Sequence, residues 1–222
     1  MRVAIITGVE QEADAFAPGV HQRVEQHGHL SVRFLEHGGH PVAITCCGVG
    51  KVNAAIAATM LATLHRAELL MIIGTAGKLS DIAGDCFVID EAVQGDYGAQ
   101  RSAGFTHYTA GSWPIGPASV EAFLAHPLPD IGLPQARIVT GDAFVECPDH
   151  SMRLRDGLGG DLVDMETGAL AQVAQRLDIP WSGIKATTDD ANGESVGDFQ
   201  TNLLLAARRA AQAAEQALID IA

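Results

Sequence analysis

The segment KVNAAIAATMLATLHRAELLMIIGTAG, residues 51–77, indicates the fold class. Its first part, 51–67, is rich in alanine and leucine, and these strong helix formers predict a helix. Its second part, 68–77, is a short apolar run that ends in glycines, which predicts a buried strand. A helix followed directly by a buried strand is typical of an α/β protein, in which helices cover a sheet.

The same alternation continues on both sides of this stretch. Residues 3–8, VAIITG, predict a buried strand, and QEADAFAPG after it predicts a helix stopped by Pro18 and Gly19. The segments 31–36 and 41–47 flank HGGH and predict a hairpin. The remaining predicted elements are strands at 86–93, 136–144 and 181–188 and helices at 119–126, 164–177 and 199–219.

These elements predict a single domain, residues 1–222, with an α/β fold. The expected architecture is a three-layer α/β/α sandwich around a central mixed, largely parallel twisted sheet, because strands that alternate with helices are covered on both faces. The hairpin makes the sheet mixed. Residues 94–118 have no regular pattern and predict a long loop, a kind of segment that often carries function in compact domains.

The charge balance favours a small molecule over a polyanion as the binding partner. With 14 basic and 27 acidic residues the net charge is −13, which disfavours nucleic acid and anionic membranes. The N-terminal apolar run is too short for a signal peptide, and no run approaches the length of a membrane span. The four cysteines have neither zinc-site spacing nor a disulfide pattern. We therefore expect a soluble, cytoplasmic protein with reduced cysteines.

Two patterns that resemble ligand sites have simpler explanations. The motif CCGVGKV, residues 46–52, lacks the length of a phosphate-binding loop and predicts a tight turn before a helix. Five histidines lie between positions 21 and 40, but their irregular spacing across a hairpin predicts polar surface positions rather than a metal site. We expect no metal ion and no cofactor.

Acidic and glycine-rich segments follow several predicted strands, which is where ligands of open α/β sheets bind. They are Glu10 and Glu12, residues 74–77, residues 140–144, and Asp189 with Asp190. Taken singly, the acids fit helix N-termini or turns. Together they predict one pocket that contains carboxylates, backbone donors and an aromatic ring.

Six motifs, in this order along the chain, resemble those of the nucleoside phosphorylase/nucleosidase superfamily, and most closely those of 5′-methylthioadenosine/S-adenosylhomocysteine nucleosidases. They are GVEQEAD (8–14), CCGVGKVNAA (46–55), IIGTAGKL (72–79), VTGDAFV (139–145), LVDMETGAL (162–170) and KATTDDAN (185–192). The resemblance runs from about residue 3 to residue 210 and is weak over 94–135. It implies a nucleoside phosphorylase-like fold, a homodimer, and hydrolysis of a 5′-substituted purine nucleoside.

The resemblance implies a role for each acid of the site. Glu12 corresponds to the glutamate that activates the attacking water, and Asp189 to the aspartate that protonates N7 of the leaving purine. Asp189 has to be protonated for this role, and partial burial favours that form. Glu166 corresponds to the glutamate that accepts hydrogen bonds from the ribose hydroxyls, and Met165 packs against the sugar. Asp164 is expected to cap the following helix.

The resemblance also implies six further substrate-binding positions, which are Thr75, Phe144, Val145, Phe199, Val9 and Val49. Phe144 corresponds to the ring that stacks on the base, and the backbone at Val145 to the groups that read its edge. Thr75 occupies the position of a site serine, Phe199 that of an aromatic near the 5′ substituent, and Val9 that of a methionine of the 5′-thio pocket.

Departures from the family motifs bear on the reaction and the substrate. Superfamily phosphorylases carry an arginine for phosphate after the first strand, whereas GVEQEAD is acidic and repels phosphate, which favours a water nucleophile. QGDYGAQRSAGF (94–105) is closer to futalosine hydrolases, so the 5′ group stays open. Lys185 stands where the family usually has arginine.

Two further alternatives are a purine nucleoside phosphorylase, which the missing arginine disfavours, and a nucleoside-binding module without activity. The second alternative follows because fold alone does not give function. The set Glu12, Glu166 and Asp189 disfavours it, since a protein that only binds has no need of all three acids.

Overall fold

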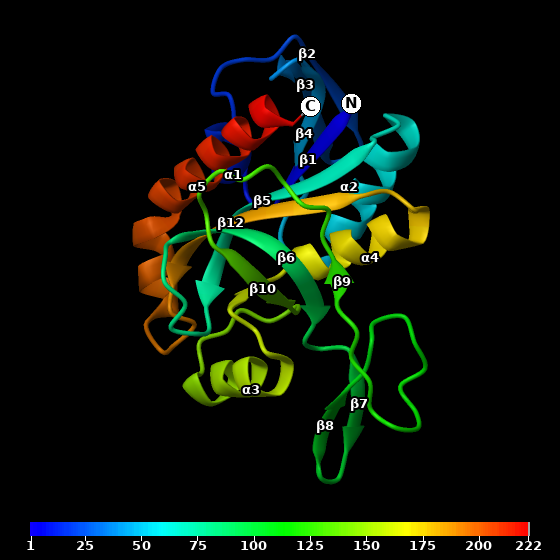
Figure 1. The fold of residues 1–222 in the computed structure, drawn as a ribbon, viewed down its shortest axis with the longest axis vertical. Helices are drawn as coiled ribbons and strands as arrows, with labels where there is room; N and C mark the ends of the chain where they lie inside the picture. Colours follow the sequence, from blue (N-terminus) through cyan, green and yellow to red (C-terminus); the bar gives the residue numbers. More distant parts are fainter. Residues whose placement is uncertain (222) are drawn as a thin grey trace.

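The computed structural model describes residues 1–221 and is built around one mixed sheet (Figure 1). Within these residues ten strands join in the order β11-β10-β6-β12-β5-β1-β4-β3-β2, with β9 paired to β6, and β7 and β8 form a separate hairpin. The strands are β1 (Val3–Thr7), β2 (Arg23–His27), β3 (Leu30–His37), β4 (His40–Cys46), β5 (Leu69–Lys78), β6 (Cys86–Gln94), β7 (Gly98–Arg101), β8 (Gly104–His107), β9 (Phe123–Leu124), β10 (Gln135–Thr140), β11 (Leu162–Asp164) and β12 (Trp181–Asp189). The helices are α1 (Glu10–Ala15), α2 (Lys51–Leu64), α3 (Pro148–Leu158), α4 (Thr167–Leu177) and α5 (Ser195–Asp220).

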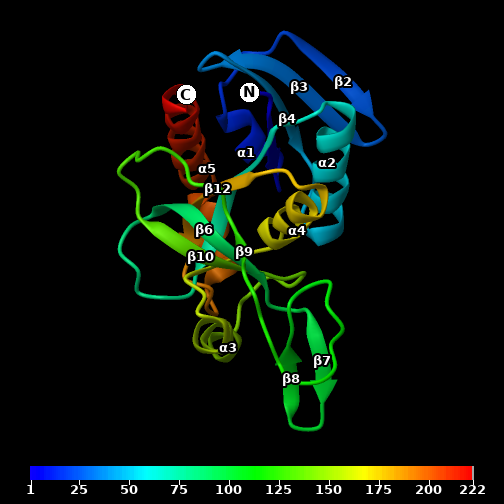
Figure 2. The ribbon, with the colours of Figure 1, turned by 45° about the vertical axis from the view of Figure 1, so that its right-hand side comes forward.

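Helices cover both faces of the sheet, which confirms the three-layer prediction (Figures 1 and 2). α2 and α4 pack against each other over one face, and α1 and α5 over the other. The buried residues of α2 and α5 are mostly alanine. Such small side chains let the helix backbones lie close to the sheet, and the strands supply the large apolar side chains of the core.

The sheet contains parallel and antiparallel pairs, and one strand, β11, pairs with both β10 and β5. β1 is parallel to both β4 and β5, and β5 is parallel to β12, whereas β12 and β6 are antiparallel. β11 follows β10 in parallel and then pairs in the antiparallel sense with the end of β5, where Val163 lies opposite Gly77. This second pairing brings the residues that follow β11 next to the glycine-bordered end of β5.

The prediction of a helix at residues 119–126 is wrong. Phe123 and Leu124 instead form the short strand β9, in which Phe123 lies opposite Ala92 of β6 and its side chain is buried. The local sequence favours a helix, but backbone pairing with β6 and burial of one aromatic ring outweigh that preference.

The loop predicted at residues 94–118 contains the hairpin of β7 and β8, and α3 was not predicted at all. The hairpin strands GAQR and GFTH have no alternation of apolar and polar residues, so their sequence gives no strand signal. α3 does carry boundary signals, with Pro148 in its first turn and Gly159 in the left-handed conformation after its end. The residues between these two signals are mostly polar, so they show no apolar periodicity from which a helix could be predicted.

The prediction that the histidines between 21 and 40 lie on the surface is right for His21 and His29 and wrong for His40. The ring of His40 is 7% exposed, its Nδ1 lies 3.3 Å from the N-terminal amine, and its Nε2 lies 3.3 Å from the carbonyl oxygen of Ile221. These contacts tie both ends of the described chain to the start of β4.

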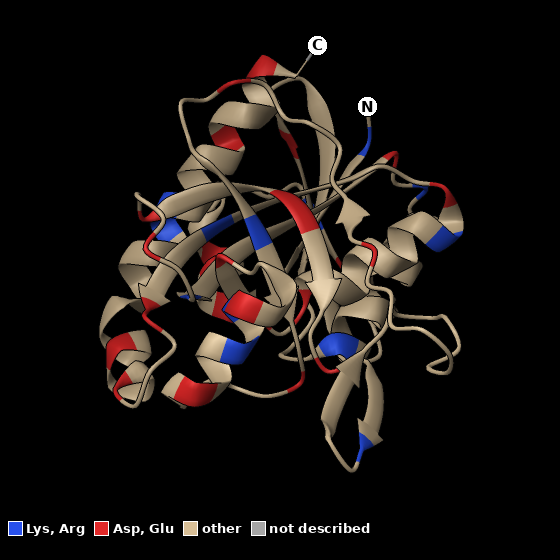
Figure 3. Ribbon diagram, turned by 60° about the horizontal axis from the view of Figure 1, so that its bottom comes forward, with Lys and Arg blue, Asp and Glu red and all other residues tan. Residues whose placement is uncertain are grey.

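Over residues 1–221, no helix combines the length and the apolar character that crossing a bilayer requires. Among the same residues, the basic positions are distributed over several elements (Figure 3).

Candidate active site

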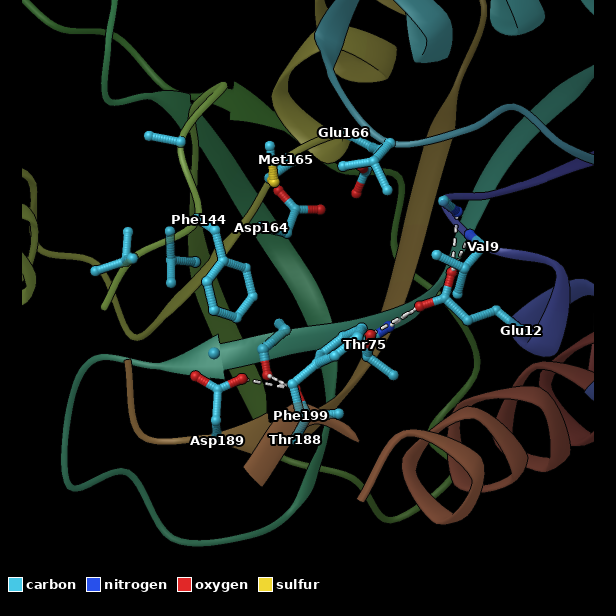
Figure 4. Close-up of a pocket in the computed structure, with 17 residues that line it drawn as sticks. Val9, Glu12, Thr75, Phe144, Asp164, Met165, Glu166, Thr188, Asp189 and Phe199 are labelled. Atoms are coloured by element: carbon cyan, nitrogen blue, oxygen red, sulfur yellow. Dashed lines mark hydrogen bonds between the residues drawn. The ribbon is translucent and has the colours of Figure 1, made fainter. Parts of the chain in front are cut away.

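A cavity of about 230 Å³ lies where six segments of the chain meet, and all ten residues expected at the site line it (Figure 4). The segments are the turn after β1, the turn between β4 and α2, the end of β5, the loop after β10, the turn between β11 and α4, and the end of β12 with α5. The ten residues are Val9, Glu12, Val49, Thr75, Phe144, Val145, Met165, Glu166, Asp189 and Phe199.

The Glu12 carboxylate is held by four hydrogen bonds from two segments. Its Oε2 accepts from the backbone N–H groups of Gly8 at 2.9 Å and Val9 at 3.2 Å, and its Oε1 accepts from the N–H of Thr75 at 2.7 Å and the hydroxyl at 2.8 Å. As the third residue of α1, Glu12 reaches back to the residue before the helix, as an N-terminal acid does. Its second oxygen, however, bonds to β5, so the local explanation accounts for only half of its contacts.

Glycine at position 74 makes this approach possible. Gly74 has φ +150°, and a Cβ placed there would lie 2.5 Å from the Glu12 carboxylate. Real Cβ atoms do not come so close, so the carboxylate can reach the Thr75 amide only because no side chain stands in its way. The close approach of the Glu12 carboxylate therefore requires glycine at the first position of the GTAG motif.

Glu166 is almost fully buried at the start of α4, and its Oε1 accepts from the N–H of Gly50 at 2.9 Å. Burial raises the pKa of Glu166 to about 7, and the nearby Asp164 carboxylate adds to this rise. Lys185 and the Gly50 amide oppose the rise without cancelling it. At neutral pH a proton on Glu166 is therefore in balance with the charged form.

Asp164, which lines the cavity, and Lys185 form a buried ion pair. Lys185 Nζ lies 2.9 Å from Asp164 Oδ2, and the two side chains are 1% and 2% exposed. Burial alone lowers the pKa of Lys185, but the carboxylates of Asp164, Glu166 and Glu12 outweigh it and raise the pKa, so the ammonium stays charged.

Asp164 also bonds to the first residue of α4, which is the contact expected of its predicted capping role, although Glu166 occupies the N-cap position itself. Its Oδ2 accepts from the N–H of Thr167 at 3.0 Å and from the hydroxyl of the same residue, and its Oδ1 accepts from the Thr140 hydroxyl at 2.6 Å. The buried carboxylate is thus fully paired, which is the condition under which a buried charge is tolerated.

Asp189, at the end of β12, lies across the cavity from Glu12 (Figure 4). Its Oδ2 accepts from the Thr188 hydroxyl at 2.8 Å and its Oδ1 from the N–H of Ala191 at 3.0 Å. A Cβ at Gly77 would lie 3.1 Å from Oδ1, so this glycine also leaves room for a carboxylate. The two hydrogen bonds fix the side chain in the orientation that faces the cavity.

The apolar part of the cavity is formed by two phenylalanines from different segments. Phe144, in the loop after β10, and Phe199, in α5, meet edge to face with ring centroids 5.9 Å apart. Phe144 is 44% exposed, and such an exposed ring beside a cavity can stack on a flat ligand. Val145, the next residue in the chain, is buried, and Val9, Val49 and Met165 are further apolar residues of the lining.

The backbone donors that a phosphate needs near "CCGVGKV" are already engaged. The Gly50 N–H donates to Glu166 and the Lys51 N–H to Asp142 Oδ1 at 2.8 Å. The Lys51 ammonium is paired with Asp96. The expected tight turn is present, since Gly50 has φ +106° and precedes α2 directly.

Sequence reasoning missed the functional contacts that join distant segments. It noted Lys185 only as a departure from a motif and assigned nothing to Thr140 or to the Gly50 amide. A lysine in the middle of WSGIKATT, a predicted strand with no other charged residue, is the signal that could have indicated a buried partner.

A cavity at the strand ends is where proteins with an open α/β sheet bind small molecules. The chain belongs to the phosphorylase superfamily, whose family model matches residues 2–219. A curated relative, a 5′-methylthioadenosine/S-adenosylhomocysteine nucleosidase of Mycobacterium bovis, is 32% identical over 188 residues, which cover 72% of this chain and 74% of the relative.

Solved structures share the fold across two activities. A 5′-methylthioadenosine/S-adenosylhomocysteine nucleosidase of Streptococcus pneumoniae, with a transition-state inhibitor, superposes with a TM-score of 0.83 at 23% identity over 99% of both chains. The futalosine hydrolase of Helicobacter pylori superposes with a TM-score of 0.82 at 19% identity, over 99% of this chain and 97% of that one. At this identity the likeness establishes the fold, and the fold alone does not distinguish the two substrates.

The pKa of Glu166 predicts how stability depends on pH. Because folding raises this pKa from an ordinary 4.5 to about 7, the folded state binds more protons than the unfolded state between these values. The stability contributed by the protonated carboxyl is therefore complete below pH 4.5 and is lost as pH rises through about 7. In thermal melts we expect the Tm of Glu166→Gln, relative to that of the unmodified chain, to rise as the pH is raised from about 5 to about 8.

The exposed Glu36→Gln is the matched control for this series and should keep a constant Tm difference over the same range. A constant difference for Glu166→Gln as well would show that the buried carboxyl titrates like an exposed one.

Proposed function

We propose that this chain hydrolyses the N-glycosidic bond of a 5′-substituted purine nucleoside, of the methylthioadenosine or adenosylhomocysteine type. The products are adenine and the 5′-substituted ribose. The observation that carries this proposal is the meeting of Glu12, Glu166 and Asp189 in one cavity that also holds an exposed aromatic ring. The similarity to nucleosidases of the same superfamily supports it.

The three acids suit three separate tasks in this reaction. Positive charge grows on the ribose as the bond breaks, and Glu166 stabilises it while accepting hydrogen bonds from the ribose hydroxyls. Glu12 is fixed by three backbone N–H donors, and when the Thr75 hydroxyl rotates away from Oε1 that oxygen orients and activates the attacking water. Asp189, on the other side of the cavity, donates a proton to N7 and so neutralises the leaving purine. Phe144 stacks on the base, and Phe199 contacts the 5′ substituent.

Water fits this site better than phosphate as the nucleophile. Glu12 and Glu166 repel a phosphate anion, and the amides of Gly50 and Lys51 already bond to carboxylates. The lining residues also include no arginine or lysine that could pair with the anion. These contacts favour hydrolysis over phosphorolysis.

A homodimer is part of the proposal and is supported by the exposed face of α2. Val52 and Ile56 are 68% and 55% exposed on this helix, next to Val49 at the cavity. Adjacent exposed apolar side chains of this kind are typical of subunit interfaces. A cytoplasmic location is supported by the free thiols of Cys46, Cys47, Cys86 and Cys147, and cell fractionation tests it.

Release of free base from a panel of nucleosides tests the proposed activity. The panel is methylthioadenosine, adenosylhomocysteine, futalosine, adenosine and inosine, each with and without phosphate. We expect adenine from the first two at rates that do not depend on phosphate. Formation of a sugar 1-phosphate would contradict hydrolysis, release from futalosine alone would favour the futalosine hydrolase alternative, and no release from any nucleoside would favour a binding module.

Asp189→Asn tests the proton donor. Asparagine keeps the shape of the side chain but cannot deliver a proton to N7, so we expect kcat to fall by about 100-fold or more. Circular dichroism and Tm should stay close to those of the unmodified chain. The neighbouring, exposed Asp190→Asn is the matched control and should retain activity. A nearly active Asp189→Asn enzyme would remove Asp189 from the mechanism.

Ile56→Glu tests the dimer. A carboxylate in an apolar interface costs desolvation energy, so we expect light scattering to report a dimer for the unmodified chain and a monomer for this variant. Leu204→Glu, at a comparably exposed position on α5 across the sheet, is the control and should leave the dimer intact. A monomeric unmodified chain would refute the proposal.

A further inference from the structure

Three potential metal ligands from two elements meet at the edge of the sheet, away from the nucleoside cavity. Glu25 and His27 point to the same side of β2 because alternate residues of a strand share a face. His65 is the residue at which α2 ends. One potential ligand atom of each lies within 4.8 Å of those of the other two, and Figure 2 shows β2 beside the end of α2.

His65 has a buried nitrogen that nothing in residues 1–221 satisfies. Its Nε2 is shielded from solvent and lacks a hydrogen-bond partner there. The ring packs between His27 and Phe34, with centroid distances of 5.3 Å and 5.0 Å. A buried polar atom without a partner is costly and uncommon, so it calls for a ligand.

The His65 ring can offer a lone pair at its unpartnered nitrogen. In the tautomer that carries its proton on Nδ1, the ring presents a lone pair at Nε2, as a metal ligand must.

The spacing of Glu25 and His27 matches that of two ligands on one ion. Glu25 Oε2 lies 3.4 Å from His27 Nε2. Two ligands at about 2.0–2.1 Å from a tetrahedral zinc ion are roughly 3.3–3.4 Å apart. The longer separation from His65 has to contract on binding, which rotation about its side-chain bonds permits.

Arg23 holds the carboxylate in place from the other side. Its Nε lies 3.1 Å from Glu25 Oε1, and its guanidinium stacks over the Phe34 ring at 4.1 Å from the centroid. A partner of this kind orients a ligating carboxylate and leaves the second oxygen free. An ion-pair network without metal would explain the contacts of Arg23, Glu25 and His27, but it leaves His65 Nε2 unexplained.

We propose that Glu25, His27 and His65 form a binding site for one divalent transition-metal ion, with Zn²⁺ as the best fit. Two imidazole nitrogens and one carboxylate oxygen suit zinc, with water as the fourth ligand, whereas Mg²⁺ and Ca²⁺ prefer oxygen ligands alone. This departs from the expectation that the histidines of this hairpin are only polar surface positions.

The bound ion would join the outer strand β2 to the C-terminal end of α2. The opposite end of α2 carries the Gly50 amide that donates to Glu166. The ion therefore acts as a clamp on the element that supports one wall of the cavity, and it takes no part in the chemistry.

Zinc binding by the untagged chain, stripped with chelator and then titrated, tests the site. We expect one Zn²⁺ per chain by calorimetry, a higher Tm with zinc, and the visible absorption of a tetrahedral site when Co²⁺ is used. His27→Ala and His65→Ala should each weaken zinc binding about tenfold or more. His29→Ala removes an exposed histidine from the same hairpin and should bind zinc as the unmodified chain does.

Tm values without metal separate loss of the ligand from loss of the fold, and His65→Gln serves where His65→Ala unfolds. Failure of the chain to bind stoichiometric zinc would overturn the proposal. So would equal affinity in the His27 and His65 variants, which would place the metal elsewhere. None of these readouts depends on nucleosidase activity, so the metal site and the proposed reaction are tested independently.

Discussion

The ion pair between Lys185 and Asp164 is the interaction on which the site depends. Both side chains are almost completely removed from water, and such charges are tolerated only when each is paired and hydrogen-bonded. Asp164 meets this condition through the Lys185 ammonium, the Thr140 hydroxyl and the start of α4. The pair therefore connects β12, β10 and α4 at one point, and Glu166 follows only two residues after Asp164.

The same pair shapes the electrostatics of the cavity. Glu12, Asp164 and Glu166 lie close enough that each affects the pKa of Lys185, the single cation at this point among the described residues. One ammonium does not balance three carboxylates, and the excess negative charge adds to burial in raising the pKa of Glu166. A negative, partly dry cavity of this kind suits a reaction in which positive charge develops on the substrate.

Much of the fold could be predicted, because its central elements have strong local patterns. β5 begins as a continuous apolar run that ends in glycines, and α2 is an alanine-rich helix that ends close to where its sequence indicates. The failures are segments whose structure depends on a partner. β9 is a strand only because β6 offers its backbone, and the hairpin of β7 and β8 has no apolar face to reveal it.

The α/β class could be inferred from the amino-acid sequence because it follows from local periodicity, and the acids and aromatic residues that line the cavity could be named because their motifs resemble those of a known family. How those residues act on one another depends on the packing of the folded chain. Glu166 takes its hydrogen bond from Gly50, 116 positions away, and Glu12 takes two from Thr75, 63 positions away. Likewise His65 meets Glu25 and His27 only because α2 ends beside the outer strand. Side-chain type and spacing along the chain do not specify such distances, because the distances depend on how separate elements pack.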